Sequence, residues 1–210
     1  MPHLSENSLL VSLALRLKGF GEVEILASVH GLDVSATGEI LAAMTEAESA
    51  MAREVDGSVK YVLTKEGRAD GELALGAELD AIGERQTVRA AYEAFLKLNG
   101  QMLQLCTDWQ IVMGTETLND HSDDDYDQEI IARLVDLDSG LRKVMIPLRG
   151  AMSRFDGYVG RFREALDRLL AGEIEYFTKP IIPSYHTVWF ELHEDLLATL
   201  GIDRASEAAH

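Results

Sequence analysis

The sequence has little cysteine, little proline and no long apolar run, and each shortage excludes a class of protein. Cys106 is the only cysteine among 210 residues, which rules out an internal disulfide and a cysteine-rich zinc site. Four prolines and the lack of a low-complexity tract predict a chain that is ordered over most of its length. No apolar run approaches the roughly 20 residues that cross a bilayer, and the run from Leu9 to Leu17 lacks the cleavage site of a signal peptide. We therefore expect a cytoplasmic protein with no membrane partner.

Positive charge is also scarce. The chain has 19 lysines and arginines against 36 aspartates and glutamates, which gives a formal net charge of −17. Nucleic-acid binders usually carry a basic face, because neutralising phosphates supplies much of their affinity. The overall charge therefore argues against nucleic-acid binding, although a local basic patch would be enough for it.

The first fifty residues have the apolar spacing of three helices. Ser5 is placed to cap the first helix, which Gly19 ends, and Gly31 ends the second. Either Asp33 or Ser35 is placed to cap the third. The positions expected to face inward repeat at helical intervals: they are Leu9, Leu10, Leu13, Leu17, Val23, Leu26, Val29, Ile40, Leu41, Met44 and Ala47.

A β-hairpin is predicted to follow the third helix. Asp56 and Gly57 separate two strand-like runs, residues 53–55 and 59–63. An Asp-Gly pair favours the primed turn of a hairpin, because both of its central positions need positive φ. Three helices followed by a hairpin is the element order of a winged helix.

Residues 61–68, with the sequence YVLTKEGR, resemble the end of the wing in MarR-like and PadR-like transcriptional regulators. In those proteins a Leu-Thr-x-x-Gly-Arg pattern leaves the second wing strand and starts a helix, and Thr64 is a suitable N-cap there. The resemblance covers about residues 5–70. It implies a mainly α protein with a winged helix-turn-helix domain of three helices and a β-hairpin wing in residues 1–70. A linker helix would occupy residues 71–86, and residues 87–210 would form an all-helical dimerisation and effector domain.

The resemblance also implies double-stranded DNA as a partner, with the third helix in the major groove and the wing on the flanking backbone. The side chains near the bases would be Ser35, Thr37, Gly38, Glu39 and Ala42, and the backbone contacts would be Arg53, Lys60, Lys65 and Arg68.

The sequence departs from this pattern in the charge of the third helix. No lysine or arginine occurs between Asp33 and Ala50, so the common contact of arginine with guanine is missing. Residues 1–70 contain six basic and eleven acidic residues, a net charge of −5. Two functions therefore stay open. One is a homodimeric, effector-responsive DNA-binding transcriptional regulator, and the other is a protein-interaction module that keeps the winged-helix fold without reading DNA.

Helical spacing continues through almost all of residues 71–210. We expect Pro147 to break or kink a helix across residues 141–150. Two adjacent apolar stripes predict that the last helix is largely buried. The expected helices cover residues 73–79, 87–109, 125–138, 153–170 and 185–200, with Ser153 and Ser184 as caps and Gly172 and Gly201 as ends.

Three segments resemble a family of similarly sized proteins that are labelled transcriptional regulators. The segments are residues 109–110, residues 119–121 with 126–127, and residues 184–197. That resemblance implies no biochemical role for them. The candidates for the lining of an effector pocket, with a small anionic or aromatic effector as ligand, are Trp109, Tyr126, Tyr185, His186, Trp189 and His193. The same residues could equally form plain core.

The sequence gives no motif for a metal, a cofactor or catalysis. His186 and His193 are seven residues apart on one helix, a rise of roughly 10 Å, which is too far for two ligands of one zinc ion. The acidic loop at residues 120–129 fails as a calcium loop, because Gln128 and Leu134 occupy the positions that need glycine and glutamate. Without a nucleophile triad or a phosphate-binding glycine loop, we expect no enzyme.

Residues 141–170 are basic, in contrast to the rest of the chain. They contain seven lysines and arginines against three carboxylates, a net charge of +4. Two interpretations stay open: these cations pair with the acidic loop at residues 120–129, or they hold an anionic ligand in arginine forks.

Overall fold

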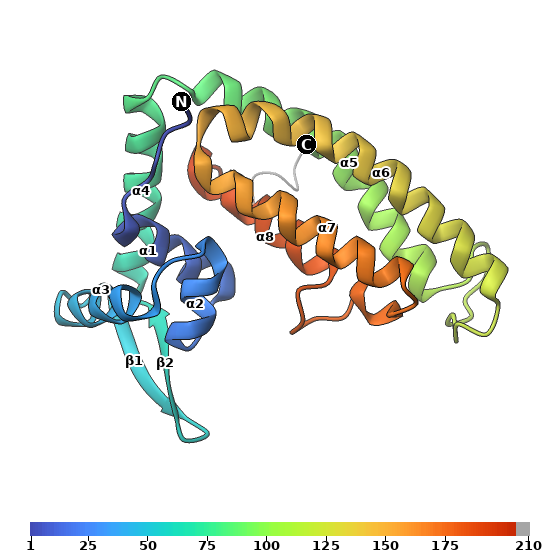
Figure 1. Cartoon of the computed structure of the whole chain (residues 1–210), viewed down its shortest axis with the longest axis horizontal. Coiled ribbons are helices and arrows are strands. Elements are labelled where there is room, and N and C mark those ends of the chain that lie inside the picture. Colours follow the sequence, from blue (N-terminus) through green and yellow to red (C-terminus); the bar gives the residue numbers. More distant parts are fainter. Residues whose placement is uncertain (205–210) are drawn as a thin grey trace.

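The computed structural model describes residues 1–204, which are mainly helical (Figure 1). Three helices precede one antiparallel hairpin, and only helices and their connections follow it among the described residues. The predicted mainly α class and the place of the hairpin are confirmed. The elements are α1 (Asn7–Lys18), α2 (Val23–His30), α3 (Val34–Glu46), β1 (Ala50–Val55), β2 (Ser58–Leu63), α4 (Lys65–Ala81), α5 (Arg85–Gln110), α6 (Asp124–Ala151), α7 (Asp156–Leu170) and α8 (Tyr185–Leu200), with 3₁₀ helices η1 (Ser153–Phe155) and η2 (Ile174–Tyr176).

Local signals set several helix ends as predicted. Gly19 and Gly31 end α1 and α2 with φ of 75° and 66°, a conformation that costs glycine no Cβ clash. Asp33 caps α3 by accepting a hydrogen bond from the Ala36 amide, and Ser184 caps α8 through the amide of Thr187.

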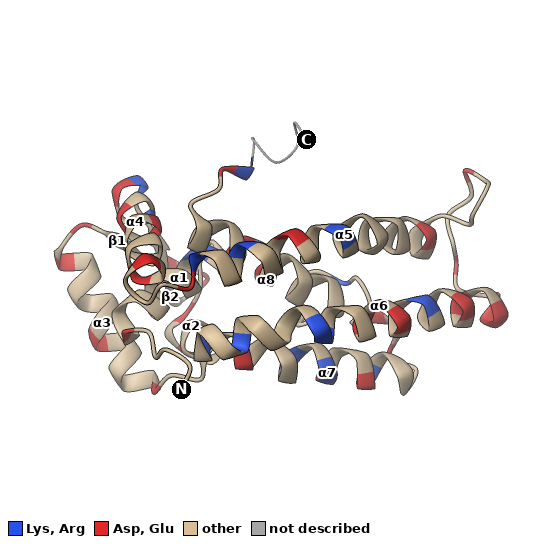
Figure 2. Cartoon of the chain, turned by 90° about the horizontal axis from the view of Figure 1, so that it is seen from above, with Lys and Arg blue, Asp and Glu red and all other residues tan. Residues whose placement is uncertain are grey.

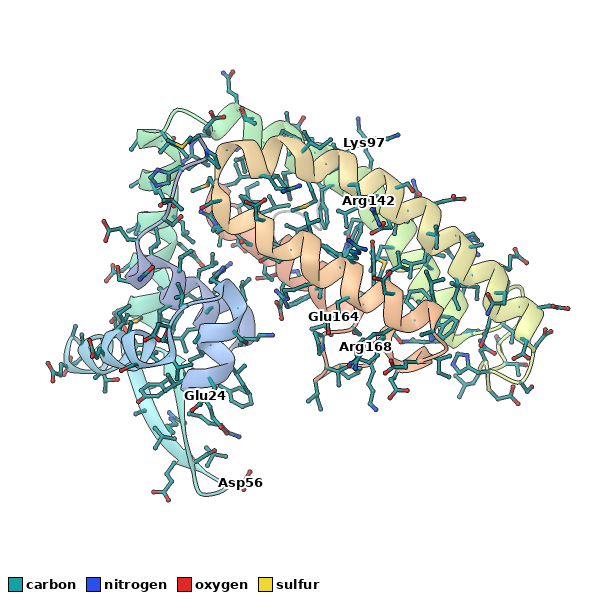
Figure 3. All side chains as sticks on the ribbon, in the orientation of Figure 1. Glu24, Asp56, Lys97, Arg142, Glu164 and Arg168 are labelled. Carbon is teal, nitrogen blue, oxygen red and sulfur yellow. The ribbon has the colours of Figure 1, made fainter. Side chains whose placement is uncertain are left out.

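The hairpin of β1 and β2 runs in register from the pair Ala50–Leu63 to the pair Val55–Ser58. Asp56 and Gly57 form the turn with φ of 53° and 78°, so both central residues are left-handed as the primed turn requires. Asp56 lies at the tip of the hairpin, which projects away from the helices (Figure 3). The predicted hairpin is confirmed.

Two joints fix the base of the hairpin. Gly21, in the connection between α1 and α2, exchanges backbone hydrogen bonds of 3.1 and 2.9 Å with Tyr61 of β2. Thr64 caps α4 by accepting from the Gly67 amide at 3.0 Å, and its hydroxyl donates to the Glu48 carbonyl at 2.9 Å. A methyl group at Gly67 would overlap the carbonyl of Ser49, so this joint needs glycine. The Thr-x-x-Gly motif thus allows the start of α4 to pack closely against the backbone just before β1.

The long helices α5 and α6 lie side by side, and α7 and α8 pack against them (Figure 1). Their shared core is rich in aromatic rings, with the Phe95 and Trp189 rings stacked 4.7 Å apart. Every residue of α8 from Glu191 to Leu200 is buried, which confirms the predicted burial of that helix. Pro147 lies inside α6, which continues to Ala151, so the helix does not break at this proline as one of the two expectations had it.

Helices α4 and α8 join the N-terminal part to the rest of the chain. Leu75 of α4 and Ala198 of α8 belong to the apolar cluster of α1, α2 and α3, whereas Leu79 and Leu196 belong to the cluster of the long helices. The Arg154 guanidinium of η1 reaches Glu78 of α4 at 3.2 Å. The same pair of helices therefore contributes side chains to both apolar clusters.

Two predicted caps are wrong, because tertiary contacts take the hydroxyl groups. Ser5 donates to Glu78 of α4 at 3.1 Å, and the residue before α1 makes no side-chain cap. Ser153 donates to the His3 carbonyl at 3.0 Å, and α7 begins three residues later.

Six of the seven cations of residues 141–170 pair with carboxylates among the described residues, and none of these carboxylates belongs to the acidic loop at residues 120–129. Arg142 pairs with Asp138 at 2.6 Å, and Arg154 reaches Asp195 at 3.4 Å. Four further pairs are Arg149–Asp156, Arg161–Glu191, Arg163–Asp167 and Arg168–Glu173. Figure 2 shows the acidic start of α6 at the end of the molecule far from the hairpin. Among the described residues, no helix has the length and hydropathy to span a membrane.

Candidate functional site

The outer face of α3 is acidic. Ser35 and Glu39 are exposed, as their predicted role near DNA bases requires. Thr37 is fully buried, and its hydroxyl donates to the Asp33 carbonyl at 2.8 Å, so its expected position on the outer face is wrong. Figure 2 shows acidic and no basic residues on α3. Phosphate groups would be repelled by this face unless cations from other elements stand beside it.

The hairpin contributes a pair of adjacent cations. Arg53 of β1 and Lys60 of β2 are directly opposite in the antiparallel register, so their side chains leave the same face of the hairpin. The Lys60 ammonium lies 5.7 Å from the centre of the Phe20 ring, which is 61% exposed. Like charges at opposed positions destabilise a hairpin unless an anion lies between them. This surface, Arg53 with Lys60 and Phe20, is called the hairpin cation pair below.

The other two predicted backbone contacts lie apart from this pair. Lys65 is exposed in the first turn of α4. Arg68, one turn later, places its Nε 3.4 Å from Glu72 and lines a cleft against α1 and α8. The structure thus brings Arg53 and Lys60 together, and it places Arg68 beside Arg16 instead.

The six residues predicted to line an effector pocket fall into two separate groups. Trp109 and Tyr126 lie where α5 leads into α6, and the Tyr126 hydroxyl donates to the Asp108 carbonyl at 2.8 Å. Tyr185, Trp189 and His193 are buried on α8 within the bundle core. The Trp189 indole donates to Asn99 at 2.9 Å, and the Tyr185 hydroxyl donates to Asp138 at 3.0 Å.

Asn99 and Asp138 thus provide hydrogen-bond acceptors for the polar groups of these buried rings. This is expected of residues packed in a core rather than of residues that line a cavity. His186, on the same helix, is half-buried, and desolvation by burial lowers its pKa.

The histidine of the acidic loop is held by a compact hydrogen-bond network. His121 Nδ1 lies 2.9 Å from Asp127, and the Asn119 amide donates to Asp127 at 2.8 Å and to the Trp109 carbonyl at 3.2 Å. His121 has φ of 60° and packs its ring 4.5 Å from that of Trp109. The network closes the connection between α5 and α6. No cluster of three or more metal-ligating side chains occurs within residues 1–204.

The cleft at Arg68 was not predicted from the sequence. It has a volume of about 700 Å³ and lies between the end of α1, the first half of α4 and α8. Its walls include Arg16, Arg68, Glu72, Phe190, Glu194 and Arg204. Arg16 directly precedes the buried Leu17 on α1 and so lies at the edge of the apolar stripe. That position is the sequence signal that the Arg16 side chain is buried.

A second, smaller hollow of about 440 Å³ adjoins the first. The two share Leu17, Lys18 and Phe190. The walls of the second are mainly apolar and come from α2, from residues 181–183 and from α8. Lys18 and Arg161 both pair with the buried Glu191 at its base, the first at 2.6 Å.

Comparisons with family models, with curated proteins and with solved structures gave no match to this chain.

Proposed function

We propose that the chain is a DNA-binding transcriptional regulator of the winged-helix, MarR-like type. Residues 1–70 are the winged helix-turn-helix domain and residues 87–210 supply the dimer contacts. The linker of residues 71–86 consists of the rest of α4, the turn after it and the first residues of α5. The order of three helices and a hairpin supports this assignment, as does the bridge from Gly21 to Tyr61, which adds a third extended segment beside the hairpin. In this arrangement α3 enters the major groove and the hairpin follows the backbone.

The hairpin cation pair is the observation that carries this proposal. Arg53 and Lys60 stand opposite each other on an exposed hairpin in a chain of net charge −17. Phosphate between the two side chains converts a repulsive pair into two attractive contacts. Ser35 and Glu39 are exposed on α3 and have the chemistry to contact bases. Serine forms hydrogen bonds with several bases, and glutamate accepts a hydrogen bond from cytosine.

The test is a titration of DNA from upstream of the protein's own coding sequence, followed by fluorescence anisotropy at several salt concentrations. We expect a shallow fall of log affinity with log salt, because few phosphates are neutralised. In the double variant Arg53→Gln, Lys60→Gln, affinity should fall by on the order of tenfold or more, and the salt slope should lose about two units.

The control replaces two cations of the helical part, Lys97→Gln with Arg163→Gln, which matches the change in charge. Lys97 points away from the molecule on α5 (Figure 3), and Arg163 is exposed on α7. Sedimentation of the same samples gives the oligomeric state, for which we propose a homodimer that reads two half-sites. Equal loss of affinity in both double variants would refute a specific role for the hairpin.

The second candidate is a protein-interaction module that keeps the winged-helix shape. The acidic, cation-free outer face of α3 favours it. Under this alternative the chain binds no DNA even at low salt, and exchanging Glu39 for lysine does not create DNA binding. A folded protein with those two results would replace the first proposal by the second.

A further inference from the structure

The first cleft has more positive than negative side chains. Four cations and three carboxylates line it, in a chain that is strongly acidic overall. Arg16 and Arg68 share one carboxylate, Glu72, and Arg16 and Arg204 share Glu194. Two of the three carboxylates are thus each shared by two arginines, so the guanidinium groups keep donors that a further anion can use.

Arg16 is the most informative of these arginines. Its side chain is only 8% exposed, yet its Nε has no hydrogen-bond partner among the described residues. Burial and the nearby Arg68 both lower its pKa, so the existing carboxylates do not fully compensate its charge. A buried guanidinium that is incompletely paired is costly, and an anion beside Arg16 in the cleft would add to the charge compensation from Glu72 and Glu194.

The adjoining second hollow offers an apolar surface. Ile25 of α2, Ile181 and Phe190 of α8 all line it, and each is exposed, Ile181 completely. Single exposed apolar side chains are ordinary, but three around one hollow mark a surface that gains from being covered. Residues 181–183 also contribute Ile182 and Pro183 to its wall.

We propose that the two hollows together bind a small amphipathic organic anion, such as a medium-chain carboxylate. Its charged head meets Arg16 and Arg68 in the first cleft, and its chain passes Leu17 and Phe190 into the second hollow. The two hollows, of about 700 and 440 Å³, have ample room for a ligand of this class.

The site connects the DNA-binding part with the last helix. Its walls come from α1, α2 and α4 on one side and from α8 on the other. A bound anion would therefore bias the position of residues 1–70 relative to α8. This regulatory consequence rests on the proposed function, whereas the binding site itself does not.

Calorimetry with sodium butyrate, hexanoate and octanoate tests the site directly, with octanamide as the uncharged control. We expect octanoate to bind at least tenfold more tightly than butyrate, because each buried methylene raises affinity by about two- to fourfold. Octanamide should bind at least tenfold more weakly than octanoate. Failure of octanoate to bind, or equal binding of all three carboxylates, would overturn the proposal.

Variants test separately the contacts of the charged head in the first cleft and those of the apolar chain in the second hollow. Arg68→Gln, an exposed position that should not disturb folding, and Arg16→Gln should each weaken octanoate binding at least tenfold. Ile25→Ser should weaken octanoate binding while leaving butyrate unchanged. Arg163→Gln, which removes an exposed cation of α7, should bind like the parent protein. If Arg16→Gln does not fold, the test rests on Arg68→Gln and Ile25→Ser. Unchanged octanoate binding in both of these variants would contradict the proposed anion site.

The DNA titration is run separately. If octanoate binds and DNA does not, the anion site stands and the proposed function is wrong. If DNA binds and octanoate does not, only the anion site is wrong.

Discussion

At the scale of single residues, buried polar groups have very different environments. Asp195 accepts hydrogen bonds from Tyr158 at 3.1 Å and Thr199 at 3.0 Å, besides its contact with Arg154. His30, at the end of α2, has an inward Nε2 with no partner among the described residues. Asp195 is thus surrounded by hydrogen-bond donors, whereas His30 is buried as a neutral ring.

His30 predicts a loss of stability in mild acid. Desolvation lowers its pKa from 6.5 to about 4, against the opposing effects of Asp195 and Glu191 and with the help of Arg154 and Arg161. Below pH 6.5 the unfolded chain takes up a proton that the folded ring refuses, so stability falls between pH 6.5 and about 4 and then levels. The loss should be about 2–3 kcal/mol from this residue.

Urea unfolding at several pH values, compared with His30→Gln, measures this contribution. The variant should have a flatter profile over that range, whereas the exposed control Lys97→Gln should match the parent. Parallel profiles for His30→Gln and the parent would show that His30 does not cause the change.

At the scale of elements, the joint between β1 and α4 depends on one glycine. The Cβ of any side chain at Gly67 would lie 2.7 Å from the Ser49 carbonyl carbon, and backbone cannot move as a flexible side chain can. Gly67→Ala should therefore cost about 3 kcal/mol or more in unfolding free energy. Chemical denaturation measures it.

Gly100→Ala is the matched control for that substitution. Gly100 lies inside α5 with open space where the methyl would be placed, so this variant should gain about 0.5–1 kcal/mol from helix propensity. Destabilisation of similar size in both variants would contradict the steric explanation.

The elements themselves were largely predictable, because local signals determine them. The apolar spacing of α1, the Asp33 cap and the Asp56-Gly57 turn each act within a few residues, and each is confirmed. Ser5 and Ser153 were misread because their partners, Glu78 and His3, are more than seventy residues away.

The clefts were not predictable for the same reason. Arg16 and Glu194 meet only when α1 and α8 pack together, and no spacing rule relates positions so distant in the sequence. The predicted effector residues are aromatic and close to polar groups, which also describes a hydrogen-bonded core.

At the scale of the whole molecule, Arg154 ties distant segments together. Its guanidinium is 1% exposed and contacts Glu78 of α4, Asp195 of α8 and Ser5 before α1. Arg154→Met should cost about 3–5 kcal/mol, because it leaves Asp195 buried without its cation.

Pairing that change with Asp195→Asn should recover part of the loss, since an amide can still bond Tyr158 and Thr199 without carrying charge. The four unfolding free energies of this cycle measure the coupling. If Arg154→Met lowers the unfolding free energy by less than about 1 kcal/mol, or if the effects of the two substitutions simply add, the ion pair between Arg154 and Asp195 does not contribute as we expect.

The pairing of the first residues with the middle of the chain has a consequence for synthesis on the ribosome. His3 bonds to the backbone at Ala151 and Ser153, and Lys18 pairs with Glu191, 173 residues further on. A nascent chain emerges from its amino end, so α1 must wait for α8 before its last neighbours exist. Residues 1–70 therefore complete their packing only after α8 has left the exit tunnel, and until then Leu17 and its neighbours lack their contacts with that helix.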